Sequence, residues 1–219
     1  AVLFKDKRIL AVQTFHAAYV QDLRKKAPVS IGHYTLEGSK AGAAAVAAWT
    51  AHQVVPLNSD GYGSLLGRTI KSTALLYNRL TSMSPFKAAT GKSYRIIPLV
   101  KPDTNIVDYV VQELGNPSLA AMNSLNQRMY DHSSYVSGNL AKKDIVLSKT
   151  VFSTVDYGDV PLDFIRTCGF ADAEWRKTPS VLVLRTTMMN PFLADEETFN
   201  NYFTIMIDAL KKAIDTMER

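Results

Sequence analysis

The sequence predicts an α/β fold in which the end of a larger α/β layer is followed by a small α+β domain. The first observation is the order of the expected elements: helices come first, then strand, strand, helix, strand, strand and helix. The second is the segment from Ser82 to Lys92, whose Ser, Pro, Thr and Gly residues indicate a boundary. The chain has 219 residues, enough for two small domains. We therefore predict domains at residues 1–90 and 91–219.

The first domain is expected to begin with a strand and to continue into a helix. Ala1–Phe4 is apolar, and because chains seldom begin inside such a strand, we expect a segment before it. A helix opens near Gly38 and ends at about Val55, before Pro56. Small side chains let this helix approach another backbone closely: Ala43, Ala44, Ala45, Ala47 and Ala48.

A second helix is expected after Asp60, which is a suitable N-cap residue. Residues at three-to-four spacing predict its buried face. They are Tyr62, Leu66, Ile70, Thr73, Tyr77 and Leu80.

The second domain is expected to alternate strands and helices. Strands are predicted at residues 94–99 and 106–111, joined by a turn at Lys101–Asp103, and again at 145–152 and 181–186. Asn116 is predicted as the N-cap, and Pro117 as the first residue, of a helix that buries Leu119, Met122, Leu125 and Met129. A last helix from about Asp195 has the clearest amphipathic repeat: Phe199, Phe203, Met206, Leu210, Ala213 and Met217.

Composition excludes several classes of function. No apolar run approaches the roughly 20 residues of a membrane span, so we expect no membrane partner. Cys168 is the single cysteine and cannot form an intrachain disulfide, which favours the cytoplasm. The net charge is +5, but the Lys and Arg residues are scattered, so no nucleic-acid partner is expected. The histidines lack metal-ligand spacing, so we expect no metal site.

Three segments resemble a known family. They are His16–Val20, Glu37–Trp49, and Leu184–Arg185 together with Met189–Phe192. The chain is similar in these segments to the C-terminal portion of fold-type-I, group II amino-acid decarboxylases, which depend on pyridoxal 5'-phosphate. The resemblance is strongest to the bacterial tyrosine decarboxylases. It covers most of the chain and is diffuse at residues 100–175.

The resemblance implies that the cofactor site is incomplete within this chain. The family's cofactor lysine follows a histidine, and no lysine here does so. The cofactor lysine, the aspartate partner of the pyridine nitrogen and the stacking histidine are therefore expected upstream. Implied partners are the N-terminal remainder of the enzyme, a second subunit of a homodimer and a small amino-acid substrate. The fragment alone is expected to be inactive.

Tyr19 is the first catalytic candidate. The family places a tyrosine in a mobile loop here, where a phenol can deliver a proton to the substrate carbon after decarboxylation. The alternative is a surface aromatic residue. His16 is a weaker catalytic candidate that supports the same loop.

Gly38, Ser39 and Lys40 are the cofactor-binding candidates. Backbone N–H groups at a helix start, with a hydroxyl and an ammonium group, suit a phosphate. The resemblance places this turn near the cofactor phosphate at the dimer interface. The alternative is an ordinary helix start, because Gly and Ser are common there.

Arg185, Thr186 and Thr187 are the substrate-binding candidates. An arginine at the end of an apolar strand needs a partner, because an unpaired buried charge is costly. The resemblance implies that Arg185 contacts the substrate carboxylate and that the two threonines line the pocket for the substrate side chain. The alternative for Arg185 is an ion pair with a structural acid.

The favoured function is part of an aromatic amino-acid decarboxylase that converts tyrosine to tyramine. Two alternatives remain open. One is a decarboxylase for glutamate or another amino acid, and the other is a non-catalytic dimerisation fragment or subunit.

Overall fold

The computed structural model describes residues 5–6, 8, 42–116, 118–134 and 143–218. The chain divides into two compact units, Ala1–Asn58 and Ser59–Arg219. The first unit contains helix α1, Ala43–Val54, which lies within the helix predicted from Gly38 to Val55. The predicted strand at residues 1–4 and the candidates His16, Tyr19, Gly38, Ser39 and Lys40 lie outside the described residues. Among the helices described, none has the length and apolar character to cross a membrane.

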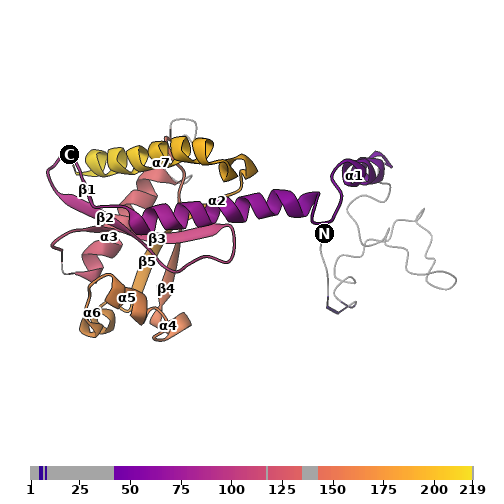
Figure 1. Cartoon of the computed structure of the whole chain (residues 1–219). Coiled ribbons are helices and arrows are strands. Elements are labelled where there is room, and N and C mark those ends of the chain that lie inside the picture. Colours follow the sequence, from indigo (N-terminus) through magenta and orange to yellow (C-terminus); the bar gives the residue numbers. More distant parts are fainter. Residues whose placement is uncertain (1–4, 7, 9–41, 117, 135–142, 219) are drawn as a thin grey trace, which may run out of the picture. The chain divides into compact units, whose positions relative to one another are not determined.

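The second unit is built on one antiparallel sheet of five strands in the order β1-β2-β3-β5-β4 (Figure 1). The strands are β1 (Phe86–Lys87), β2 (Ser93–Pro98), β3 (Ile106–Glu113), β4 (Ser148–Ser153) and β5 (Ser180–Thr187). The four longer strands correspond to the four predicted ones. The mixed helix and strand architecture confirms the predicted α+β fold of this part of the chain.

Four helices of the second unit are short pieces that the sequence pattern did not reveal. They are α4 (Thr154–Tyr157), α5 (Leu162–Thr167), α6 (Asp172–Lys177) and the 3-10 helix η5 (Pro191–Ala194). Each spans fewer than two turns, too little for an apolar period of 3.6 residues to be visible. The three long helices are α2 (Tyr62–Ser82), α3 (Leu119–Ser133) and α7 (Glu196–Met217).

Apolar side chains form two core clusters on the two faces of the sheet. Along β5, Leu182 and Leu184 belong to one cluster, and Val181 and Val183 belong to the other. This alternation follows from the two-residue period of a strand. Residues of α2 and α7 complete the first cluster, whereas residues of α5 and α6 complete the second.

Helix α7 confirms the amphipathic prediction. Asp195 is its N-cap, and the Asp195 side chain accepts a hydrogen bond from the Thr198 N–H at 3.1 Å. Its buried residues include Phe199, Met206, Leu210 and Ala213.

Helix α2 differs from the prediction in its N-cap and in which of its residues are buried. Its N-cap is Gly61 rather than Asp60, and its buried residues are Thr69, Ser72, Thr73, Leu76 and Leu80. The prediction was correct for Thr73 and Leu80, but Leu66 and Ile70 are exposed. The N-terminal part of α2 projects beyond the sheet, so burial begins only at Thr69 (Figure 1).

Helix α3 begins with a different cap from the one predicted. Ser118 is the N-cap, and its hydroxyl accepts a hydrogen bond from the Ala121 N–H at 3.3 Å. Asn116 instead accepts a hydrogen bond from the Ser118 N–H at 3.0 Å, in the turn before the helix. Pro117 lies outside the described residues. The predicted buried face of the helix is confirmed.

Helix α3 lies where β3 and β5 separate. The two strands pair from Ile106 opposite Thr187 to Tyr109 opposite Leu184, and no further. Beyond that point, Asn126 accepts a hydrogen bond from the Val111 N–H at 2.9 Å and donates one to the Val111 carbonyl at 2.8 Å. Asn123 accepts from the Leu182 N–H at 2.9 Å and donates to the Ser180 carbonyl at 2.8 Å.

The two asparagines therefore take the place of backbone partners. A buried N–H or carbonyl group without a hydrogen bond is costly, and these four groups lie beyond the last strand pair. The apolar residues of α3 divide in the same way. Leu119 and Met122 join one core cluster, whereas Leu125 and Met129 join the other.

We predict that Asn126→Ala lowers the free energy of unfolding by about 2–4 kcal/mol, because it leaves both backbone groups of Val111 buried without a partner. Urea unfolding followed by circular dichroism measures the change. Asn200→Ala is the control, since Asn200 is an exposed helical asparagine whose side chain accepts a hydrogen bond from Arg79. A loss for Asn126→Ala no larger than the loss for Asn200→Ala would contradict this account of α3.

Candidate functional site

The substrate-binding candidates lie at the end of β5, where it pairs with β3. Arg185 stands opposite Asp108 in the antiparallel ladder. Its Nε atom lies 3.4 Å from Asp108 Oδ1, so the two side chains form an ion pair across the strands. Asp108 is therefore the structural acid that the alternative for Arg185 predicts.

Asp108 was not singled out from the sequence. Its Oδ1 atom is buried and makes no hydrogen bond with the described residues. Burial raises the pKa of Asp108, and the positive charge of Arg185 partly opposes that rise. One feature of the sequence could have identified Asp108: it is a carboxylate within the apolar strand Ile106–Glu113, and such a group needs a compensating charge.

Part of the Arg185 guanidinium remains available for another ligand. The side chain is 33% exposed, and the ion pair uses Nε. The Arg185 guanidinium donates no hydrogen bond to another described residue, and Nε is its closest atom to Asp108. A guanidinium group carries five N–H donors in a planar fork that matches a carboxylate. Asp108 can therefore orient Arg185 while its outer edge binds an anion.

The two threonines that follow lie on opposite faces of the sheet. Thr186 is buried, and its hydroxyl lies 3.2 Å from the hydroxyl of Tyr109, on the face that α2 and α7 cover. Thr187 is exposed and alternates back to the face of Arg185. The structure thus brings Arg185 and Thr187 to one face and places Thr186 on the other.

The segment after β5 forms hydrogen bonds beside β3, within η5 and with α2. The Met188 N–H donates to the Asn105 carbonyl at 2.8 Å, next to β3. Asn190 caps η5 by accepting a hydrogen bond from the Phe192 N–H at 2.9 Å. Arg68 of α2 donates from Nε to the Pro191 carbonyl at 2.9 Å. The motif at residues 189–192 is therefore a turn held between the sheet and α2.

The described residues do not by themselves fit pyridoxal phosphate. A lysine that carries this cofactor acts from a sheltered position, and none of the described lysines is buried. Lys92 lies at a cavity, but its Nζ is 3.3 Å from Glu113 and 3.0 Å from Glu218, and two carboxylates repel a phosphate group. The predicted phosphate-binding residues Gly38, Ser39 and Lys40 are outside the described part of the chain.

Comparison with known proteins points to one family. The family model described as "Tyrosine decarboxylase, C-terminal" matches residues 72–214. An L-tyrosine decarboxylase of Enterococcus faecalis is 41% identical over 214 residues, which are 98% of this chain and 34% of the relative. One from Levilactobacillus brevis is 41% identical over 97% of this chain and 33% of the relative. One from Enterococcus faecium is 38% identical over 98% of this chain and 35% of the relative. The chain thus spans about a third of the length of these curated relatives.

We predict that Asp108→Asn becomes more stable relative to the unchanged chain as the pH rises. The folded-state pKa of Asp108 is raised above its ordinary value of 3.8. Its contribution to stability is therefore present below that value and is lost as the pH rises through the raised pKa. Urea unfolding at a series of pH values from about 3 to 7 measures the difference.

Asp172→Asn is the matched control with the opposite sign. Hydrogen bonds from Arg166 lower the pKa of Asp172, so its contribution is present at neutral pH and is lost as the pH falls through that lowered pKa. If Asp108→Asn instead lost stability relative to the unchanged chain with rising pH, the account of Asp108 as a desolvated acid would be wrong.

Proposed function

This chain belongs to the tyrosine decarboxylase family, and we propose that it forms the C-terminal third of an enzyme that converts L-tyrosine to tyramine and carbon dioxide. The observation that carries the proposal is its 38–41% identity to three L-tyrosine decarboxylases over nearly the whole chain. The matched family model, which describes the C-terminal part of such enzymes, supports the same position within the protein.

In this proposal pyridoxal phosphate is the cofactor, and residues outside the described part hold it. The lysine that carries it belongs to the N-terminal remainder of the enzyme. Gly38, Ser39 and Lys40 contact its phosphate through backbone N–H groups, a hydroxyl and an ammonium group. This arrangement is consistent with the poor fit of the described residues to the cofactor.

Arg185 binds the α-carboxylate of the substrate in this proposal. Support comes from its geometry: Nε is the guanidinium atom closest to Asp108, and the side chain is 33% exposed. Thr187 is on the same face and is exposed, so it can contact the same ligand. Thr186 remains a predicted pocket residue, and its contact with Tyr109 lies on the opposite face of the sheet.

Tyr19 supplies the proton that the substrate carbon takes up after carbon dioxide has left. A phenol, whose ordinary pKa is about 10, is protonated at neutral pH and can donate that proton when positioned close to the carbon. His16 supports the same segment. Both assignments rest on the resemblance of residues 16–20 to the family.

The enzyme is proposed to act as a homodimer in the cytoplasm. Support for the dimer comes from the small side chains of α1, which permit another backbone to approach closely. The cytoplasmic location rests on the single free cysteine, Cys168.

The function is tested with the whole enzyme, that is, this chain joined to its N-terminal remainder. L-tyrosine and L-glutamate are supplied separately, and amine and carbon dioxide are measured. We expect turnover of tyrosine, little turnover of glutamate, and none by the 219-residue chain alone. Preference for glutamate would instead favour a different decarboxylase, and inactivity toward all amino acids would favour a non-catalytic subunit.

We predict that Arg185→Lys in the whole enzyme lowers kcat/KM for tyrosine by about ten- to a hundredfold, because lysine cannot make a planar two-point contact. Cofactor absorbance should be retained. Arg166→Lys is the control, since Arg166 forms exposed ion pairs with Asp163 and Asp172. If Arg185 serves only to neutralise Asp108, the double variant Arg185→Gln/Asp108→Asn will be fully active, which would exclude the substrate contact.

We also predict that Tyr19→Phe lowers amine formation by about 10²–10⁴-fold, the usual contribution of a general acid. The substitution keeps the ring, so the KM for tyrosine should change little. Tyr157→Phe, which alters a half-exposed tyrosine packed against Phe152, is the control and should leave the rate unchanged. Near-normal amine formation by Tyr19→Phe would remove this residue from the reaction.

A further inference from the structure

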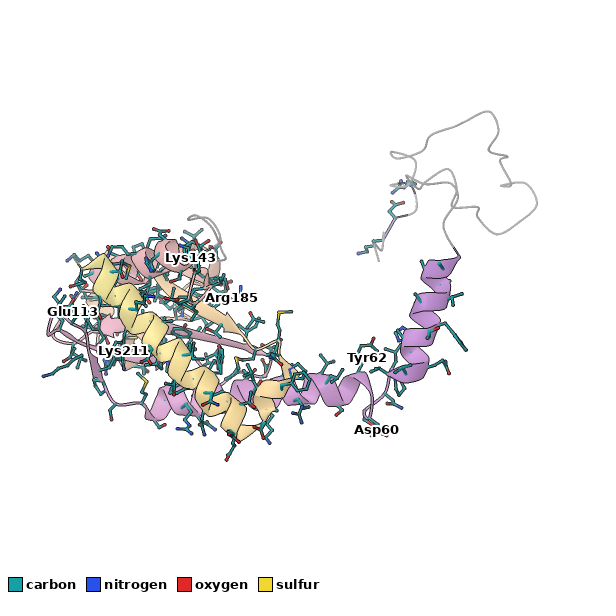
Figure 2. All side chains as sticks on the ribbon, turned by 90° about the horizontal axis from the view of Figure 1, so that it is seen from above. Asp60, Tyr62, Glu113, Lys143, Arg185 and Lys211 are labelled. Atoms are coloured by element: carbon teal, nitrogen blue, oxygen red, sulfur yellow. The ribbon has the colours of Figure 1, made fainter. Side chains whose placement is uncertain are left out.

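A cavity of about 320 Å³ lies at the end of the sheet where β3 and β5 have separated. The end of β3 and helix α3 line it, together with Lys92 just before β2 and Glu218 just after α7. Two buried side chains of α3, Met122 and Leu125, give it an apolar side. Figure 2 shows Glu113, a lining residue, well separated from Arg185, so this cavity is distinct from the proposed substrate contact.

The polar side of the cavity carries two cations and two anions. Lys92 Nζ lies 3.0 Å from Glu218 and 3.3 Å from Glu113, and Arg128 Nη2 lies 3.8 Å from Glu218. The net charge of these four side chains is therefore zero, although each of them carries a charge. Such a surface favours a ligand that carries both signs over a simple anion or cation, because each like charge would be repelled.

These ion pairs can be exchanged for contacts with a ligand. The side chains of Lys92 and Arg128 are 46% and 50% exposed, whereas those of Glu113 and Glu218 are 28% and 12% exposed. Separating these charges has a cost, because the carboxylates are the less exposed partners. A ligand inside the cavity offsets that cost by offering each charge a new partner that is better shielded from water.

The buried phenol of Tyr94 is not part of the cavity lining, but the charges of residues that line the cavity act on it. Tyr94 is fully buried, and its hydroxyl makes no hydrogen bond of good geometry with the described residues. Burial raises the pKa of Tyr94 to about 12, with a further rise from Glu218 and Glu113. The charges that act on this phenol thus belong to residues that line the cavity.

We propose that this cavity binds a free α-amino acid with an apolar side chain, at a second site separate from the reaction centre. The ligand's ammonium group contacts Glu113 and Glu218, and its carboxylate contacts Lys92 and Arg128. Its side chain lies against Met122 and Leu125. A decarboxylase with such a site can respond to the level of free amino acids without using its substrate contacts.

Isothermal titration calorimetry of the full 219-residue chain tests the proposal. The probe is L-phenylalanine, and two analogues each lack one of its charges: 2-phenylethylamine has no carboxylate, and 3-phenylpropanoate has no ammonium group. We expect saturable binding of L-phenylalanine and binding about tenfold weaker or more for each analogue, because each loses a charge-assisted contact. No saturable binding at millimolar concentrations, or equal binding of either analogue, would overturn the proposal.

A pair of matched variants locates the site. Arg128→Gln should weaken L-phenylalanine binding about tenfold, since it removes one partner of the carboxylate. Arg166→Gln should leave binding unchanged, because that arginine is equally exposed, at 51%, but forms its ion pairs with Asp163 and Asp172. Circular dichroism checks that both variants are folded. If Arg128→Gln binds as tightly as the unchanged chain, the ligand lies elsewhere and the proposal is wrong.

Discussion

The separation of β3 and β5 around α3 is the constraint on which the rest of this structure depends. Backbone groups at the parted ends are buried and must be paired. Asn126 and Asn123 supply those partners from one side of α3, to Val111, Leu182 and Ser180. Because both asparagines belong to one helix, the position of α3 along the strands is specified by hydrogen bonds as well as by apolar packing.

The same constraint produces two different chemical environments at the two ends of β3 and β5. Where the strands pair, the ladder places Asp108 opposite Arg185 and creates a cross-strand ion pair. Where they part, α3 brings Met122, Leu125 and Arg128 beside Glu113 and creates a cavity. At the paired end, the guanidinium of Arg185 beside a partly buried acid suits an anionic ligand group. At the parted end, a set of paired charges with no net charge suits a zwitterion.

Burial decides what the acidic residues of this domain do. Asp108 is partly desolvated and has a raised pKa, so its charge requires Arg185. Asp195 is exposed and caps α7, and hydrogen bonds from Thr198 lower its pKa. Both residues stand next to an apolar segment in the sequence. Of these two acids, only Asp108 would become a buried unpaired charge if it lost its cation. Its partner Arg185 is therefore the candidate for ligand binding.

The sequence by itself determined those features that depend on local pattern. The apolar repeat of α7 and its start near Asp195, the buried face of α3 and the four longer strands could be predicted, because periodicity acts over neighbouring residues. The family resemblance could be predicted as well. Only the tertiary structure decided which half of α2 is buried, that Ser118 rather than Asn116 caps α3, and that Asp108 is the partner of Arg185. Asp108 and Arg185 are 77 positions apart in the chain, and their contact depends on strand register, which no local pattern encodes.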